Sequence, residues 1–198
     1  MGYSLLDLLA LMQGHFAEGL TVEGVASPEA ALVLSLLPDD PALPLAQLAP
    51  SSHPVAALVA ATHGLDPAWT EVLGSLAPVL PWRFTYAPRA DAPGLENRMA
   101  WAEIVGPAAP LRNDRVGFGL TFIDRDTYYL PHRHPAVELY NVVTGRALWT
   151  LDGVTAPRPP GSFILHPSSA VHAMRTLGDP MLAIYSWSGD IVSPTIYA

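Results

Sequence analysis

Two imidazoles, a carboxylate and a phenol occur close together within residues 131–140 (PHRHPAVELY). All four occupy even positions: His132, His134, Glu138 and Tyr140. Successive side chains of an extended strand point to opposite faces, so we expect these four on one face unless a bend between the histidines and the carboxylate changes the register. Two imidazoles and a carboxylate on one face suit a divalent transition metal, and the pattern leaves Fe, Zn, Mn, Co and Ni open.

A third imidazole would complete the ligand set, and His172 is the best candidate for it. It follows the turn signal at residues 167–169 (PSS) and begins a later expected strand. A single histidine is usually a polar core or surface residue, and we interpret His15, His53 and His63 in that way. His166 is ambiguous, since it is close to His172 in sequence but precedes the turn, and we interpret it as structural. The group at residues 132–138 differs, because burying three such side chains without a metal would be costly.

Composition excludes several other classes of function. The chain has no cysteine, which excludes disulfides and thiolate metal sites. Eighteen acidic residues against ten basic ones give a net charge of −8, so we expect neither a nucleic-acid nor a membrane partner. This charge mildly favours a cationic or zwitterionic small ligand. No apolar run approaches the roughly 20 residues of a membrane span, and Asp7 argues against a signal peptide, so we expect a cytoplasmic protein.

The elements that would position these residues change character near Trp82. Residues 1–81 are expected to be helical, with Ser4 capping a first helix, a second helix from Ser27, a third at 52–62 and a fourth from Asp66. After them come short apolar runs separated by turn signals, which indicate strands at 82–86, 99–105, 116–123, 128–134, 137–143, 147–151, 162–165, 171–176 and 181–187. We therefore predict a helical N-terminal extension, residues 1–81, and a β-barrel or sandwich domain, residues 82–198. The oligomeric state is not readable, and a homodimer stays open.

The spacing of the candidate ligands resembles the first sequence motif of the cupins. It runs from His132 through His134 and Glu138 to Gly145, with one, three and six residues between them. Residues 159–161 (PPG), which lead to His172, resemble the second motif. The resemblance covers about residues 82–190. It implies a mainly β fold, a jelly-roll-like cupin barrel, with the three histidines and Glu138 as metal ligands.

Two positions depart from the cupin pattern. Asp126 stands where the first motif has a glycine, and Thr176 stands where the second has an asparagine. The first motif is specific, whereas the second is weak by itself.

A narrower resemblance lies within the cupins. Residues 129–140 and 182–190, together with 81–83 (PWR), are similar to the cupin-type dimethylsulfoniopropionate lyases. The resemblance implies a carbon–sulfur lyase that splits this zwitterionic substrate into dimethyl sulfide and acrylate by β-elimination. It implies Tyr140 as the base and Tyr129 as an assisting hydroxyl. Strand alternation would instead place Tyr128 on the metal face.

Aromatic faces attract cations such as a sulfonium. Four aromatic residues of the expected strands are candidates for this contact, although each could equally be core packing: Phe122, Trp149, Tyr185 and Trp187. Two other functions stay open, because the same ligands serve many reactions. One is an Fe(II)-dependent cupin dioxygenase, and the other is a non-catalytic small-molecule-binding cupin.

Overall fold

The N-terminal helices begin where side chains can satisfy their free backbone N–H groups. A computed structural model describes residues 2–24, 26–38, 48–62 and 64–198. In α1 (Leu5–Ala17), Ser4 and Asp7 form a reciprocal capping box. In α4 (Pro67–Leu76), the carboxylate of Asp66 accepts a hydrogen bond from the backbone N–H of Trp69 at 3.0 Å. The other helices are α2 (Ala26–Leu36), α3 (Val55–Ala60) and the short 3₁₀ turns η1 (Glu18–Thr21), η2 (Ala77–Val79) and η3 (Leu95–Asn97).

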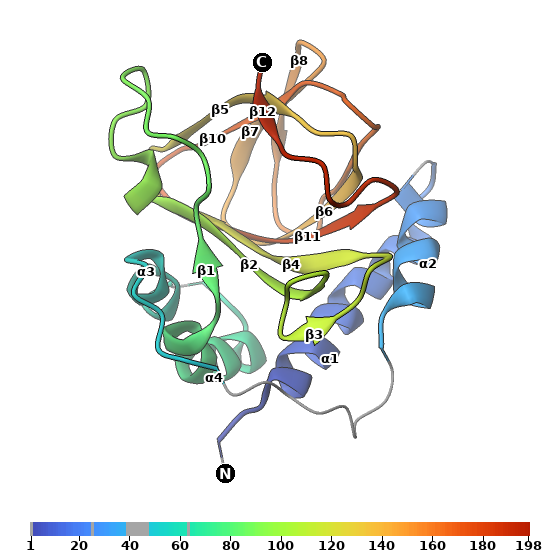
Figure 1. The fold of residues 1–198 in the computed structure, drawn as a ribbon, viewed down its shortest axis with the longest axis vertical. Helices are drawn as coiled ribbons and strands as arrows, with labels where there is room; N and C mark the ends of the chain where they lie inside the picture. The colour runs from blue at the N-terminus through green and yellow to red at the C-terminus, as the bar shows by residue number, and fades with distance from the viewer. Residues whose placement is uncertain (1, 25, 39–47, 63) are drawn as a thin grey trace.

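The strands form two sheets that face one another (Figure 1). The first sheet has the order β1-β2-β4-β11-β6-β9, with β3 paired to β2. Its strands are β1 (Trp82–Arg83), β2 (Met99–Gly106), β3 (Leu111–Arg112), β4 (Gly117–Ile123), β6 (Val137–Thr144), β9 (Phe163–His166) and β11 (Met181–Ser188). The second has the order β12-β5-β10-β7-β8. Its strands are β5 (Tyr128–Arg133), β7 (Ala147–Leu151), β8 (Val154–Arg158), β10 (His172–Thr176) and β12 (Ile196–Tyr197).

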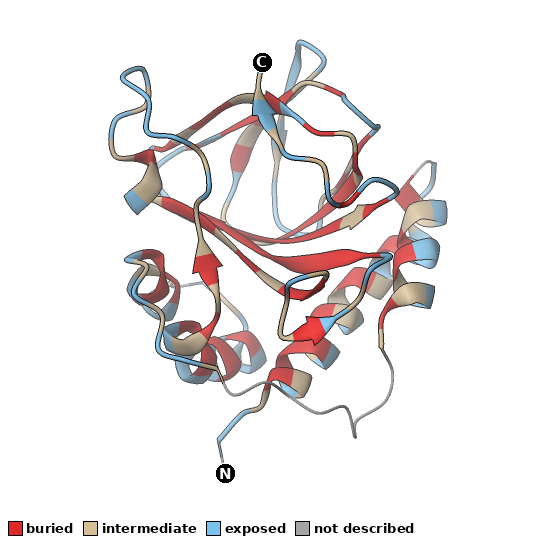
Figure 2. Ribbon diagram, viewed as in Figure 1, coloured by how far each residue is buried: buried red, intermediate tan, exposed pale blue. Residues whose placement is uncertain are grey.

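The first sheet is buried on both faces (Figure 2). On its outer face, Phe118 of β4 packs edge-on against Phe16 of α1, with ring centroids 5.2 Å apart. The inner-facing side chains of α1 to α4 and the outer-facing side chains of this sheet form one apolar cluster. A second cluster, which includes Tyr140, Trp149 and Tyr185, fills the interior between the sheets. The helical layer therefore supports the sheet that carries part of the candidate site.

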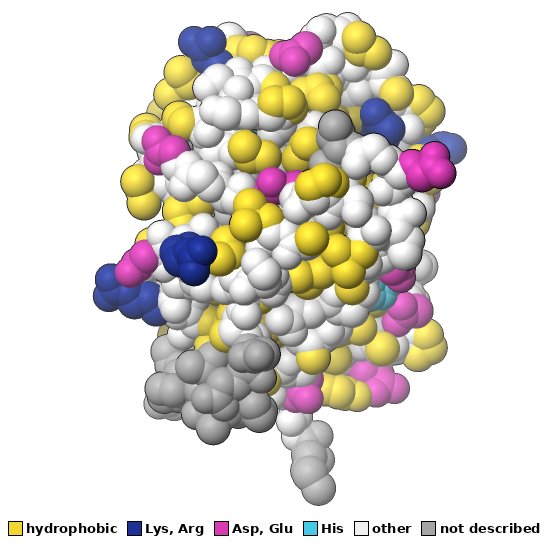
Figure 3. Space-filling view, turned by 90° about the vertical axis from the view of Figure 1, so that its right-hand side faces the viewer, with side chains coloured by type: hydrophobic (Ala, Val, Ile, Leu, Met, Phe, Trp, Pro, Cys, Tyr) yellow, Lys and Arg dark blue, Asp and Glu magenta, His cyan; other side chains and the backbone are white. Residues whose placement is uncertain are grey.

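The structure confirms the predicted fold class, a mainly β cupin-like fold with N-terminal helices. The division at residue 82 stays a prediction, although the first strand does begin at Trp82. Sequence reasoning missed β3, β8 and β12. Within the described part of the chain, no helix is long and apolar enough to cross a membrane. On the face shown in Figure 3, charged side chains of both signs are scattered among neutral ones.

Candidate metal and active site

A β-bulge in β5 decides which tyrosine enters the barrel. His132 pairs with His172 and Tyr129 pairs with Met174, so two residues of β5 lie between the pairs where β10 has one. The extra residue turns the ring of Tyr129 to the side of His132, where the two rings stack with centroids 3.9 Å apart. Tyr128 lies instead under the guanidinium of Arg175, 4.2 Å from its ring centroid. Strict strand alternation was therefore wrong at this point.

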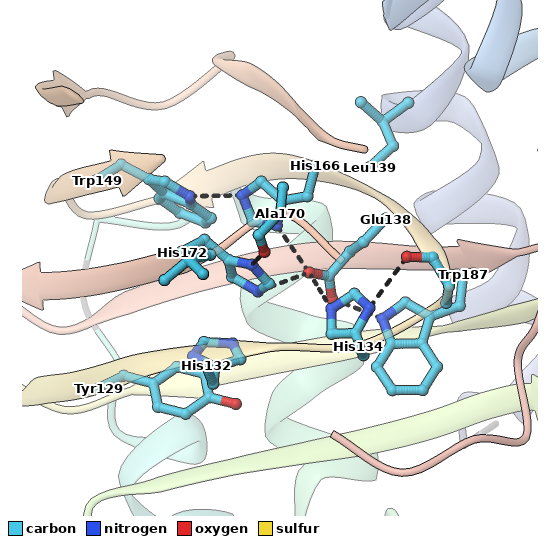
Figure 4. A network of polar contacts seen from close by, with 12 residues as sticks. Tyr129, His132, His134, Glu138, Leu139, Trp149, His166, Ala170, His172 and Trp187 are labelled. Carbon is cyan, nitrogen blue, oxygen red and sulfur yellow. Dashed lines mark hydrogen bonds and ion pairs between the residues drawn. The ribbon is translucent and has the colours of Figure 1, made fainter. Parts of the chain in front are cut away.

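Three candidate ligands converge from different elements, as Figure 4 shows. His134 lies in the turn after β5, Glu138 lies on β6, and His172 begins β10. Their ligand atoms lie within 4.8 Å of one another, and all three residues are buried. The Glu138 Oε2 atom is 3.1 Å from Nε2 of His134 and 3.3 Å from Nε2 of His172. This group could hold a metal ion. His132 lies beside it, with its ring centroid 4.0 Å from that of His172.

The backbone fixes the orientation of the three imidazoles. The Nδ1 atoms of His132, His134 and His172 each lie 2.8–3.1 Å from a main-chain carbonyl two residues away in sequence. A carbonyl only accepts, so each Nδ1 carries a proton, and each Nε2 is the atom left to bind a second proton or a metal. Nε2 of His172 is buried without a hydrogen-bond partner in the structure. Imidazole nitrogens that face a buried carboxylate suit a bound cation, so these residues fit a metal.

Charge within the group favours an ionised carboxylate. Burial would raise the pKa of Glu138, but the charge of His134 and then the hydrogen bonds of His134 and His166 hold it well below its usual range. Burial would lower the pKa of His134, but the charge and hydrogen bond of Glu138 raise it above its ordinary value. For His132, burial followed by the nearby His172 lowers the pKa strongly. A proton and a metal would therefore compete for the same lone pair on His134.

Glu138 is held by further donors that sequence reasoning did not assign to it. Nε1 of Trp149 donates to Nε2 of His166 at 2.8 Å, so the proton of His166 sits on Nδ1 and is donated to Oε2 of Glu138 at 2.9 Å. Trp187 donates from Nε1 to the other oxygen, Oε1, at 2.7 Å. Burial lowers the pKa of His166 to about 4, consistent with a neutral ring. His166, which was ambiguous in the sequence, therefore orients Glu138; His63 lies outside the described residues. Glu138 and His166 are cross-strand partners in β6 and β9, a pairing that the sequence alone does not reveal.

A cavity of about 270 Å³ opens onto this group. Tyr129, Tyr140, Tyr185 and Trp187 line it, as do all the candidate ligands except His172. The structure corrects two of the four aromatic candidates. Trp149 lies behind His166, and Phe122 belongs to the apolar cluster on the helix side of the sheet; neither lines the cavity.

The phenols in the cavity hold their protons firmly. Burial, and then the charge of Glu138, raise the pKa of Tyr140 well above its ordinary value, and the opposing effect of Thr121 is smaller. Burial likewise raises the pKa of Tyr129, whose hydroxyl contacts that of Tyr86. Tyr86 was not anticipated, because it follows the short strand β1 in an irregular segment. A phenol here can act as a base only when positive charge lies close to it.

Comparisons with known proteins agree on one family. A family model described as dimethylsulfoniopropionate (DMSP) lyase matches residues 41–183. The DMSP lyase DddQ of Ruegeria pomeroyi is 32% identical over 57% of this chain and 57% of its own length. The putative lyase DddL of Cereibacter sphaeroides is 30% identical over 66% of this chain and 53% of its own length. The chain thus matches little more than half of either relative.

Solved structures extend the similarity along nearly the whole chain. The crystal structure of DddQ from Ruegeria pomeroyi has a TM-score of 0.79 at 28% identity and covers 98% of this chain and 95% of that one. A chain from the crystal structures of the DMSP lyases RdDddP and RnDddQII has a TM-score of 0.80 at 27% identity, and the match covers 98% of this chain and 97% of that one.

Proposed function

The chain belongs to the dimethylsulfoniopropionate lyase family, and from that premise we propose that it cleaves DMSP to dimethyl sulfide and acrylate by β-elimination. One observation carries the proposal. A buried Glu138 and oriented imidazoles adjoin a cavity into which Tyr140, two residues along the same strand, also points. A small zwitterion that entered this cavity would meet ligand atoms and a proton acceptor together.

We propose that His132, His134, Glu138 and His172 hold a divalent metal, with Fe, Zn, Mn, Co and Ni as candidates. Such an ion would withdraw charge from the substrate carboxylate and so make the adjacent C–H bond more acidic. The backbone carbonyls that accept from the Nδ1 atoms fix the orientation of the three imidazoles before anything binds, which supports this proposal. His166 and Trp187 hold the two oxygens of Glu138 in the same way.

We assign the base to Tyr140. In the proposed step, its phenolate oxygen takes the proton from the carbon beside the carboxylate. The electron pair of that C–H bond forms the double bond of acrylate, and the C–S bond breaks with its electrons on sulfur. Dimethyl sulfide leaves as a neutral molecule, so no general acid is needed. Because burial and Glu138 favour the protonated phenol, the phenolate requires positive charge in the cluster at that moment.

Tyr129 is the assisting hydroxyl in this proposal. Its ring is fixed by stacking on His132, and its hydroxyl is held by the hydroxyl of Tyr86. A phenol restrained at both ends can orient a substrate at little cost in side-chain entropy.

The test is to incubate the purified, metal-loaded protein with DMSP and measure dimethyl sulfide in the headspace. We expect release that is lost on chelation and in Tyr140→Phe, while that variant keeps its metal. Release by Tyr140→Phe at the wild-type rate would remove Tyr140 from the mechanism. Absence of release with all five metals would remove the substrate assignment. Oxygen uptake by the Fe-loaded protein with enol, thiol or aromatic substrates would then support a dioxygenase, and tight ligand binding without turnover would support a binding protein.

A further inference from the structure

The cavity also contains a carboxylate that the proposed elimination does not use. Glu103 lies on β2, away from the metal-binding group, and lines the same cavity. On this strand Trp101 and Glu103 face inward, whereas Ala102 and Ile104 face the helices. The carboxylate side chain is only 13% exposed. A largely buried carboxylate calls for positive charge nearby, and Arg83, which lines the same cavity, supplies part of it.

Glycines of the first sheet make the room for this acid. A Cβ at Gly106 would lie 2.4 Å from Cδ of Glu103, and one at Gly119 would lie 2.9 Å from its Cα and 2.8 Å from the ring of Tyr185. A Cβ at Gly117 would lie 3.4 Å from Oε1 of Glu103 and 3.4 Å from the Cβ of Trp187. The carboxylate therefore lies against Gly106 and reaches Gly117, the glycine that also adjoins Trp187.

Trp187 connects the two acids of the cavity. In the strand register it pairs with Glu138 on one side and with Gly117 on the other. Two inter-strand steps of about 4.8 Å separate the strand position of Glu138 from that of Gly117. A small zwitterion that lay along the indole would thus have one end near the imidazoles and the other near Glu103.

Arg83 satisfies only part of the charge of Glu103. Its guanidinium donates to Oε2 at 2.9 Å, and this single contact leaves Nε of Arg83 without a partner. Within the described residues, Oε1 accepts no hydrogen bond from a protein donor. The side chain of Arg83 is 42% exposed, so solvent screens its charge more than that of the acid. Burial raises the pKa of Glu103 more than Arg83 lowers it, so a second cation would stabilise the ionised form.

We propose that Glu103 is a specificity-determining residue, the anionic partner of the cationic end of the substrate, with Trp101 and Tyr185 beside it. For the elimination proposed above, on which this inference rests, that end is a sulfonium. Glu103 selects substrates whose leaving group carries a positive charge, and Arg83 holds the carboxylate in place.

The test compares Glu103→Gln with Asp179→Asn, which removes an equal charge at an exposed turn away from the cavity. Steady-state kinetics with DMSP are combined with calorimetry, in which trimethylsulfonium and propionate serve as separate probes. Loss of a charge-assisted contact predicts that Glu103→Gln raises KM for DMSP and the Kd of trimethylsulfonium by about 10- to 100-fold. The change in kcat is expected to be much smaller, and metal content, melting temperature and propionate binding should not change. Asp179→Asn should match the wild type in every measurement.

The results separate this inference from the proposed function. If the protein releases dimethyl sulfide but Glu103→Gln leaves KM and trimethylsulfonium binding unchanged, the lyase assignment stands and the role of Glu103 is overturned. If DMSP is not cleaved but trimethylsulfonium binds in a Glu103-dependent manner, the cation subsite stands and serves another cationic substrate. A lower kcat with an unchanged KM in Glu103→Gln would also overturn the cation subsite, because that result would indicate a role for Glu103 in the chemical step.

Discussion

Replacement of His166 should weaken metal binding although His166 is not a proposed ligand. Its Nδ1–H donates to Oε2 of Glu138 at 2.9 Å in a fully buried position. A hydrogen bond to a charged group contributes about 1.5–3 kcal/mol, and about 1.4 kcal/mol corresponds to tenfold in affinity. We therefore expect His166→Leu to raise the metal Kd by about 10- to 100-fold, the range known for partners that orient metal ligands.

His166→Asn provides the matched control. The side-chain nitrogen of asparagine is bonded to Cγ, as Nδ1 of histidine is, so it can donate to the same oxygen. Both variants deprive the Nε1 donor of Trp149 of its acceptor, so their difference isolates the hydrogen bond to Glu138. We expect the asparagine variant to bind metal within about tenfold of the wild type.

Metal affinity is best measured by competition with a chromophoric chelator, alongside near-ultraviolet circular dichroism to verify the fold. Equal and near-wild-type affinities in both variants would show that His166 does not support Glu138. If both variants keep native spectra but bind metal equally and much more weakly than the wild type, the imidazole itself is required. That result would refute the role of the hydrogen bond to Glu138.

Three further predictions concern the barrel and its metal. Tyr129→Phe should lower the rate of dimethyl sulfide release while Tyr128→Phe leaves it unchanged, because the bulge turns only Tyr129 inward; equal effects would contradict this placement. Removal of the metal with a chelator should lower the melting temperature in calorimetry by about 5–10 °C. A metal at 100 times its Kd stabilises the folded state by about 2.7 kcal/mol, and each kcal/mol shifts the melting temperature of a chain of this size by about 2–4 °C. An unchanged melting temperature would show that metal binding does not stabilise the fold. Phe118→Ala should cost about 3–5 kcal/mol in urea unfolding, because the side chain is fully buried against Phe16 of the helical layer; a cost below 1 kcal/mol would contradict the packing.

Features set by local sequence were predicted well. The helix that begins after Ser4 and the one that begins after Asp66 follow from capping residues that act within one turn. The spacing of His134 and Glu138 fixes their proximity, because one short turn joins the end of β5 to the start of β6. These interactions need no knowledge of how distant strands pair.

Features set by strand register were not predictable. His166 reaches Glu138, and Glu103 enters the cavity, only because particular strands are neighbours in the sheet. Phe122 was misplaced because β4 is buried on both faces, so its sequence carries no polar alternation to distinguish them. The strand β8 was missed because it is largely exposed and contains Pro157, which is tolerated at a sheet edge.

The candidate ligands come from both sheets: His132 and His172 from the second, Glu138 from the first, and His134 from the turn between them. A metal bound to these residues would link the two sheets. Replacing any of them should therefore lower the stability of the fold as well as the activity. In a mutational scan that measures cellular abundance, these positions should score as intolerant, just as they would in a scan of activity. Tyr140→Phe and Glu103→Gln should lower the activity score but not the abundance score, because neither removes a link between the sheets. Comparison of the two maps would distinguish residues that this barrel keeps for folding from those it keeps for its substrate.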